Sequence, residues 1–150
     1  MGSVELPVVA GVVRRAGRIM IARRAGPDDL AGMWEFPGGK IRAGESPEAA
    51  LRREWSEEFG MEVEPLRLLG ETRHASRSRV VRLVFVEARA AGVPRFLEAH
   101  DAVAWVRAGG IGLYRFAPAD RAMVRHIGLC RGVRPLPAGI TGRGNRPHPR

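Results

Sequence analysis

The chain has 150 residues, enough for one domain with an ordinary core, and its hydrophobic (45%) and charged (27%) fractions are those of a soluble globular protein. No apolar run approaches the roughly 20 residues that span a bilayer, and the first residues lack the basic and apolar regions of a signal peptide. A single cysteine, Cys130, excludes an internal disulfide, so we expect a cytoplasmic protein.

The net charge of +9 is concentrated towards the C-terminal end of the chain. Five of the 25 basic residues lie among the last twenty positions, which contain no acid. Subtracting these five charges from the net charge of +9 leaves +4 for residues 1–130. A mildly basic body suits small anions at least as well as polymers. We therefore predict that the body binds no nucleic acid, and we leave open that the arginine-rich end contacts RNA or an acidic partner.

The N-terminal part of the chain predicts two strands joined by a turn. Residues 8–13 and 18–23 are rich in β-branched and apolar residues, and Gly17 marks the turn between them. Alternation along the second strand sends Arg23 and Arg24 to opposite faces of the sheet. Only one of these two arginines can therefore point into a site.

A loop with two consecutive glycines follows at residues 34–40. Pro37 stiffens this segment, and Gly38-Gly39 allows the backbone to approach a ligand closely. We expect this loop to lie beside a functional site.

A helix is predicted over residues 47–59. Ser46 is a good N-cap, Pro47 suits the first helical position, and Gly60 is a natural residue to end the helix. Apolar residues recur every four positions and predict a buried stripe along one side, formed by Leu51, Trp55 and Phe59.

The same helix carries three carboxylates, Glu54, Glu57 and Glu58, at positions i, i+3 and i+4. They fall within about 100° of arc and form one acidic face, and the spacing also allows an ion pair between Arg53 and Glu45 that would fix the preceding loop. Mg²⁺ prefers a few carboxylates completed by water and substrate phosphates. The spacing alone leaves two interpretations open, a magnesium site for a polyphosphate and a salt-bridged surface helix.

The second half of the chain predicts further strands. Residues 63–73 and 80–89 form two of them, with a polar loop at 75–78, and the second is apolar on both faces. A short strand is predicted at 102–106, followed by a glycine-rich loop at 109–112.

A last helix is predicted to begin at Pro118, and the chain then loses its periodicity. We expect one domain over residues 1–131 and a flexible Pro-, Gly- and Arg-rich tail over 132–150. The apolar face of the helix is predicted to consist of Met123, Val124, Ile127 and Cys130.

The segment 39–61 also fits a known signature in all its fixed glycine and polar positions: Gly39, five residues, Glu45, seven residues, Arg53-Glu54, an apolar residue, one residue, Glu57-Glu58, one residue and Gly60. The chain therefore resembles the Nudix hydrolases, with Trp55 where the family usually has an aliphatic side chain. Residues 8–24, 34–40, 100–105 and 117–120 extend the resemblance to the MutT-like branch over residues 8–128. It implies an α/β fold, an α/β/α sandwich around a mixed sheet.

The resemblance also implies a metal site and its supporting group. Glu54, Glu57, Glu58 and the carbonyl of Gly38 would bind Mg²⁺, with Mn²⁺ as a possible substitute. Arg53 would belong to the same catalytic group through its ion pair in the preceding loop.

Substrate contacts are implied outside the helix. Arg24 matches the phosphate-side arginine better than its neighbour does, and Glu35 and the segment Gly38-Gly39-Lys40 would line the same site. Asp120 matches the residue that hydrogen-bonds the edge of the base, where the enzyme for oxidised guanine nucleotides carries Asn. An acid in the first turn of a helix is also explained by the helix dipole alone.

The general base is the position where the chain departs from its relatives. They often place a glutamate directly before the histidine, whereas this chain has Ala99 there, with Glu98 and Asp101 on either side. We prefer Glu98 to Asp101. His100 is expected to be an exposed loop histidine, and the other histidines are expected to be structural or solvated: His74, His126 and His148.

The predicted function is Mg²⁺-dependent hydrolysis of a nucleoside triphosphate, including oxidised or modified ones, to the monophosphate and pyrophosphate, as in nucleotide-pool sanitation. The alternatives are CTP or another nucleoside diphosphate derivative, and a nucleotide-sensing module without turnover. Ser76-Arg77-Ser78 lacks the Pro or Tyr of relatives that act on ADP-ribose or dinucleoside polyphosphates. The protein is expected to be a monomer or a homodimer.

Overall fold

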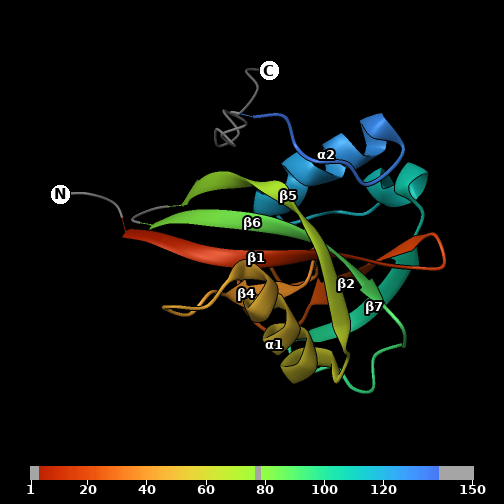
Figure 1. The fold of residues 1–150 in the computed structure, drawn as a ribbon, viewed down its shortest axis with the longest axis horizontal. Helices are drawn as coiled ribbons and strands as arrows, with labels where there is room; N and C mark the ends of the chain where they lie inside the picture. Colours follow the sequence, from red (N-terminus) through yellow and green to blue (C-terminus); the bar gives the residue numbers. More distant parts are fainter. Residues whose placement is uncertain (1–3, 77–78, 139–150) are drawn as a thin grey trace.

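The computed structural model describes residues 4–76 and 79–138, which form a mixed sheet of seven strands with helices on both faces (Figure 1). The strands are β1 Val4–Arg15, β2 Arg18–Arg24, β3 Trp34–Glu35, β4 Gly38–Lys40, β5 Val63–Ser76, β6 Arg79–Ala90 and β7 His100–Val106. The helices are α1 Pro47–Phe59 and α2 Arg121–Cys130, with 3₁₀-helices η1 Ala108–Leu113 and η2 Pro118–Asp120.

The sheet has the order β3-β2-β1-β6-β5, with β4 added to β1 and β7 added to β2. The long central pair, β1 and β6, is parallel, and the remaining pairs are antiparallel. The turn between β1 and β2 has positive φ at both Ala16 (51°) and Gly17 (76°), which suits the right-handed twist of a hairpin. The predicted hairpin is confirmed.

Two apolar layers lie on opposite faces of the sheet, and β1 shows how its alternation creates them. Val9 and Val13 pack in the cluster that contains α1, whereas Ala10 and Val12 pack in the cluster that contains α2. At Gly11, a Cβ atom would lie 2.7 Å from Cδ1 of Leu51, so the glycine allows α1 to pack close to the sheet. The predicted α/β/α sandwich is confirmed.

Helix α1 begins and ends where the sequence predicts. The Ser46 hydroxyl accepts a hydrogen bond from the Ala49 N–H (3.1 Å), and Gly60 ends the helix with a left-handed φ of 61°. The predicted stripe is fully buried, and the Trp55 Nε1–H donates to the Pro37 carbonyl (2.9 Å), which ties the helix to the glycine loop.

Four local expectations differ from the structure. The glycine loop is paired as β3 and β4, because Gly38 lies directly against the Val9 carbonyl and a side chain there would overlap the backbone of β1. The polar loop predicted at 75–78 is shorter, since β5 continues to residue 76 and β6 begins at Arg79; residues 77–78 lie outside the described parts. The glycine-rich loop at 109–112 is a 3₁₀-helix, and Cys130 is exposed and does not belong to the apolar face of α2.

The C-terminal segment continues to pack on the domain beyond the boundary predicted at residue 131. Val133 is 8% exposed, and the Leu136 N–H donates to the Leu69 carbonyl (2.6 Å). Gly70, at a φ of 123°, leaves room for Leu136, whose Cβ would lie 3.0 Å from an added Cβ. The packed part therefore includes residues 132–138, and residues 139–150 of the predicted tail lie outside the described residues.

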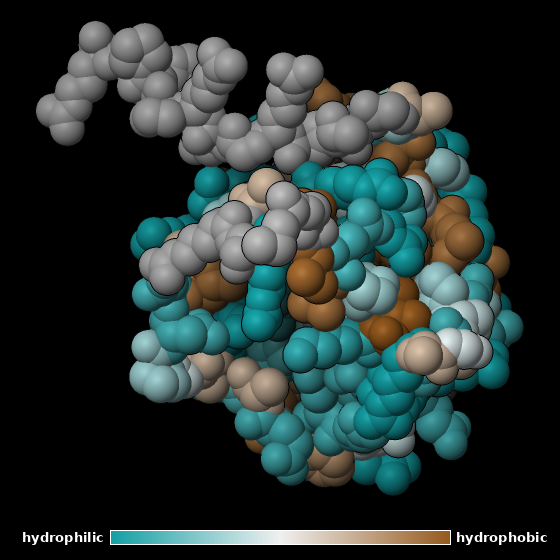
Figure 2. Space-filling model, turned by 90° about the vertical axis from the view of Figure 1, so that its left-hand side faces the viewer, coloured by the Kyte–Doolittle hydropathy of each residue, from teal (hydrophilic) through white to brown (hydrophobic). Residues whose placement is uncertain are grey.

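In the described parts of the chain, no helix is long and apolar enough to cross a membrane. The face in Figure 2 is mostly hydrophilic, and its hydrophobic residues are scattered over the surface. Where the described residues are visible on this face, they form no single continuous apolar patch.

Candidate active site

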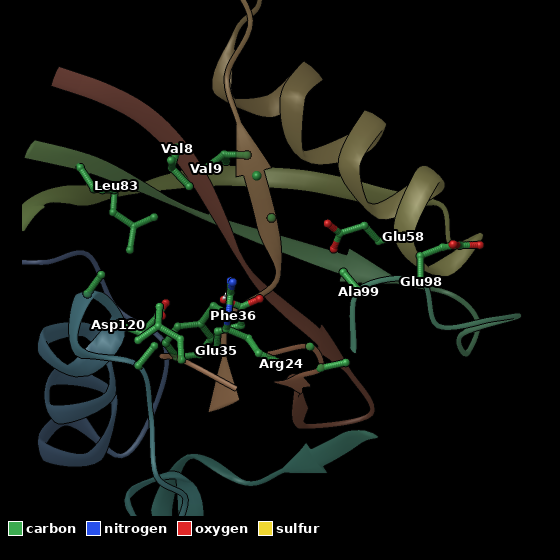
Figure 3. A pocket seen from close by; sticks show the side chains of 18 residues that line it. Val8, Val9, Arg24, Glu35, Phe36, Glu58, Leu83, Glu98, Ala99 and Asp120 are labelled. Carbon is green, nitrogen blue, oxygen red and sulfur yellow. Dashed lines mark hydrogen bonds and ion pairs between the residues drawn. The ribbon is translucent and has the colours of Figure 1, made fainter. Parts of the chain in front are cut away.

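A cavity of about 550 Å³ opens beside the sheet, a size typical of small-molecule sites. Its helix end is formed by Glu58 and Glu98, and its pocket end by Arg24, Glu35 and Asp120 (Figure 3). Between the two ends, the lining is mainly apolar and comes largely from β1, β6 and the segment before α2: Val8, Val9, Val81, Leu83, Phe36, Ala117 and Ala119.

Arg53 organises the acidic face of α1. Its Nε and one terminal nitrogen donate to both carboxylate oxygens of Glu45 (2.9 Å each), and the second terminal nitrogen donates to Glu54 (2.8 Å) and lies 3.5 Å from Glu57. The hydrogen bond with Arg53 holds the pKa of Glu45 down to about 2. The predicted ion pair between loop and helix is confirmed, and the same guanidinium orders two of the three helix carboxylates.

The Gly39 backbone lies directly against the Glu54 carboxylate. A Cβ at Gly39 would come within 2.6 Å of Oε1 of Glu54, so a larger residue would displace this carboxylate. Lys40 follows on β4 and lies outside the cavity: its side chain is exposed, while its carbonyl accepts a hydrogen bond from Arg53 (2.9 Å). Gly38 and Gly39 also line the cavity, so the approach of a ligand to these two glycines stays a prediction.

Glu58 is the helix carboxylate that faces the cavity. Its side chain is 20% exposed, and its carboxylate points towards the interior of the cavity in Figure 3. The pKa of Glu58 is raised to about 7, chiefly by burial and also by the charges of Glu54 and Glu35, while His100 and Arg24 act in the opposite direction.

At the pocket end, Arg24 and Glu35 form an ion pair between β2 and β3. Arg24 donates to Glu35 (3.3 Å) and to Asp28 (2.8 Å). Burial alone would lower the pKa of Arg24, but these two carboxylates raise it on balance. Arg23 lies on the other face, where it pairs with Asp101 (2.6 Å). As alternation predicts, only one of the two arginines lines the cavity.

Asp120 lies at the bottom of the pocket end and is 5% exposed. Burial raises its pKa well above the usual range, and the nearby Glu35 adds to the effect. Although Asp120 precedes α2, its side chain makes no cap hydrogen bond. The helix dipole alone therefore does not account for this carboxyl group, which faces the cavity.

A family model described as NUDIX domain matches residues 5–127. The chain belongs to the Nudix family. It is 38% identical to a putative 8-oxo-dGTP diphosphatase 2 of Mycobacterium tuberculosis over 80% of this chain and 86% of that protein. It is 37% identical to a CTP pyrophosphohydrolase of Escherichia coli over 87% of this chain and 96% of that protein.

Solved structures agree with these relatives. The solution structure of the E. coli ORF135 protein superimposes with a TM-score of 0.72 at 31% identity, covering 90% of this chain and 96% of that one. A MutT protein from Methanosarcina mazei shares the fold with a TM-score of 0.75 at 21% identity, over 85% of this chain and 95% of that one. The predicted family and the predicted class of enzyme, a Nudix pyrophosphohydrolase, are confirmed.

Nudix hydrolases generally depend on a divalent metal, and the helix end fits one by its chemistry. Its donors are carboxylate oxygens, and among the described residues Glu58 forms no ion pair with an arginine or lysine, with only Nδ1 of His100 lying 3.9 Å from its carboxylate. In the described residues, no group of three or more His, Cys, Asp or Glu side chains is gathered closely enough to hold a metal alone. A hard cation such as Mg²⁺ takes some of its ligands from carboxylates and the others from water and phosphates.

His100 is the site residue for which the sequence expectation was wrong. It was expected to be an exposed loop histidine, but it begins β7 and its side chain is 2% exposed. Its Nε2 lies 2.7 Å from Glu35, and its ring stacks on Phe59 with centroids 5.2 Å apart. One extra residue on β7 between the partners of Arg23 and Arg24 shifts the register at this point, so plain alternation does not locate the histidine.

The two candidates for the general base have different surroundings. Glu98 lines the cavity and its N–H donates to the Glu58 carbonyl (3.3 Å), although its own carboxylate points away from that of Glu58 (Figure 3). Asp101 is engaged by Arg23 and does not line the cavity. Of the two acids, Glu98 is therefore the one beside the cavity.

Proposed function

We propose that this Nudix enzyme hydrolyses nucleoside triphosphates to the monophosphate and pyrophosphate with Mg²⁺, acting on a cytoplasmic nucleotide pool. The observation that carries the proposal is one cavity that joins an acidic helix face at one end to a polar pocket at the other. A nucleotide has the same two-part chemistry, with a phosphate chain that needs cations and a base that needs hydrogen-bonding groups. The names of the two curated relatives support this substrate class.

At the helix end, Glu54, Glu57, Glu58 and the Gly38 carbonyl would hold the metal. When bound, Mg²⁺ would neutralise phosphate charge and stabilise the charge that develops during attack of water on phosphorus. The chain itself orders the site through Arg53, which fixes two of the carboxylates relative to the loop. Mn²⁺ is a possible substitute because it accepts the same oxygen ligands.

At the pocket end, Arg24 would contact a phosphate oxygen, and Asp120 and Glu35 would contact the base. The raised pKa of Asp120 favours its protonated form, which can donate as well as accept a hydrogen bond. Glu98 is the proposed base because its backbone is anchored beside Glu58, and its carboxylate can reach an attacking water by rotation of an exposed side chain.

The test is product identification after incubation with a panel that includes dGTP, 8-oxo-dGTP, dCTP, CTP and 5-methyl-dCTP. We expect pyrophosphate and a monophosphate from at least one of them, and a loss of roughly 10²-fold or more in Glu57→Gln. Equal rates for wild type and Glu57→Gln would refute the catalytic assignment. Tight nucleotide binding without turnover would instead support a sensing module.

CTP is a second candidate substrate because the chain covers nearly the whole of the CTP pyrophosphohydrolase relative at 37% identity. The panel separates the two candidates directly. A kcat/KM for CTP above that for 8-oxo-dGTP would place the enzyme with this relative, and the reverse order would place it with the 8-oxo-dGTP diphosphatases.

A further inference from the structure

We propose that His100 is a positioning residue for substrate selection, which holds the Glu35 carboxylate in place at the pocket end and turns its other ring nitrogen towards Glu58 at the helix end. This inference rests on the proposed nucleotide hydrolysis and adds a determinant of which base is accepted.

The first argument is that both oxygens of Glu35 are held by different groups. Oε1 lies 2.7 Å from Nε2 of His100, and Oε2 accepts from Arg24 at 3.3 Å. A carboxylate held at both oxygens keeps one orientation, and hydrogen bonds to charged groups are about twice as strong as neutral ones. Without the shorter contact, only the longer one to Arg24 would orient the carboxylate.

The second argument is that the histidine cannot easily move. Its side chain is 2% exposed, and its ring lies nearly parallel to that of Phe59, with an interplanar angle of 21°. Phe59 is itself fully buried as the last residue of α1. The orientation of Glu35 is therefore fixed to the packing of the helix that carries the acidic face.

The third argument concerns the other ring nitrogen. Nδ1 of His100 is buried and has no hydrogen-bond partner in the described residues, and it lies 3.9 Å from Oε2 of Glu58. A buried polar atom without a partner is destabilising, so a histidine that only filled space would be better replaced by an apolar ring. Its two nitrogens instead face one acid at each end of the cavity.

The fourth argument is the β-bulge that places the residue. His100 is opposite Arg24 although Ala102 is opposite Arg23, so one extra residue lies on β7 at this point. Bulges commonly re-aim a side chain next to an active site. Without this one, Asp101 would take the position opposite Arg24, and a third acid would join Glu35 and Glu58.

The test compares two replacements of the same ring. His100→Phe keeps the ring and the stacking on Phe59 but removes both nitrogens, whereas His100→Gln loses the ring and keeps an N–H near the position of Nε2. We expect His100→Phe to lower the ratio of kcat/KM between the best and the second-best nucleotide by roughly tenfold, the value of one charge-assisted hydrogen bond. His100→Gln should keep most of that ratio.

A double-mutant cycle with Glu35→Gln tests whether the histidine acts through that carboxylate. If it does, His100→Phe adds little to the loss of selectivity already caused by Glu35→Gln, because the two residues share one interaction. His126→Gln, a change on α2 away from the cavity, is the matched control and should leave the ratio unchanged.

Two results would overturn the inference: a His100→Phe ratio equal to that of wild type, or equal proportional losses for all nucleotides in both variants, as a purely structural role predicts. Turnover by wild type tests the proposed function, and the ratio between nucleotides in the variants tests the inference, so the two can fail separately. If wild type shows no turnover, the selectivity of nucleotide-induced shifts in melting temperature is compared in the same variants. This selectivity in the melting-temperature shifts should be lost in His100→Phe, and unchanged selectivity in that variant would also overturn the inference.

Discussion

The two ends of the cavity are built in different ways. The acidic face at the helix end comes from one continuous segment, residues 45–58, in which Arg53 joins a loop glutamate to the carboxylates of α1, and Glu98 is added from the loop before β7. The pocket end collects single side chains from four separate segments: Arg24 of β2, Glu35 of β3, His100 of β7 and Asp120 of η2. Local spacing sets the geometry of the first, whereas sheet register and packing set that of the second.

This difference separates two properties of the enzyme. Changes at the helix end should affect every nucleotide alike, because all of them carry the same phosphate chain. Changes at the pocket end should alter the ranking of nucleotides, because the nucleotides differ in the base and the sugar. The predictions below test this separation, beginning with the largest expected effect.

Glu58→Gln should produce the largest loss, since it removes the negative charge of the helix carboxylate that faces the cavity. We expect kcat to fall roughly 10²- to 10³-fold for all nucleotides tested, with the fold intact. Steady-state kinetics on the panel measure this, and Glu62→Gln, the same chemical change at an exposed position, is the control. A loss confined to one nucleotide would contradict the separation between the two ends.

The adjacent glycines of β4 should give opposite phenotypes when changed to alanine. Gly39→Ala pushes the Glu54 carboxylate aside, so we expect a loss of activity of roughly 10- to 100-fold with little change in melting temperature. Gly38→Ala meets the Val9 backbone, which cannot yield as a side chain can, and should lower the free energy of unfolding by about 2–4 kcal/mol.

Thermal melts and assays of the two variants side by side separate these effects. Gly112→Ala is the control because a Cβ there meets no atom within 4 Å. If Gly39→Ala proved the less stable of the two variants and kept its activity, the proposed role of the close contact with Glu54 would be wrong.

The helix end could be predicted from sequence because helix geometry is regular. Ser46 and Gly60 limit the helix, the four-residue spacing buries its apolar stripe, and the spacing from Glu45 to Arg53 allows the ion pair that the structure contains. None of these features depends on a distant part of the chain. Their catalytic roles remain predictions until the variants are measured.

The pocket end could not be derived in the same way. Arg24, Glu35 and Asp120 were proposed from a family resemblance, and spacing alone would not have brought them together. His100 was misjudged because a bulge shifts the register of β7. The packed segment after residue 131 was missed as well. Leu136 packs in the space left by the missing side chain of Gly70, and sequence periodicity does not reveal such a contact.

The metal-free protein should lose stability as the pH rises, because the folded state raises the pKa of Glu58 from 4.5 to about 7. The folded state then binds more protons than the unfolded state between about pH 4.5 and pH 7. The destabilisation is absent below that window and complete above it. A rise in pKa from 4.5 to about 7 corresponds to about 3 kcal/mol, and solvent screening of the partly exposed carboxylate reduces this to about 2 kcal/mol.

Thermal melts in EDTA at pH 5 and pH 8 test this pH dependence of stability, with the Glu58→Gln variant as the comparison. The variant should be more stable than wild type at pH 8 and should lose that advantage towards pH 4.5. Added Mg²⁺ should stabilise wild type more at pH 8 than at pH 5, since it binds the ionised carboxylate. If the difference in melting temperature between wild type and Glu58→Gln in EDTA were the same at both pH values, Glu58 would not be desolvated as described.

The smallest expected effect concerns the C-terminal segment, which packs in the apolar layer that contains α2. Leu136 is half-buried against Gly70, so Leu136→Ala should lower the free energy of unfolding by about 1 kcal/mol. A chain ending at residue 131 should be less stable than one ending at residue 138, because it lacks the buried Val133 as well as Leu136. Any test of polyanion binding by the arginine-rich tail should therefore use the cut after 138. If the cut after 131 left the unfolding midpoint in urea unchanged, the packing of this segment would contribute nothing to the domain.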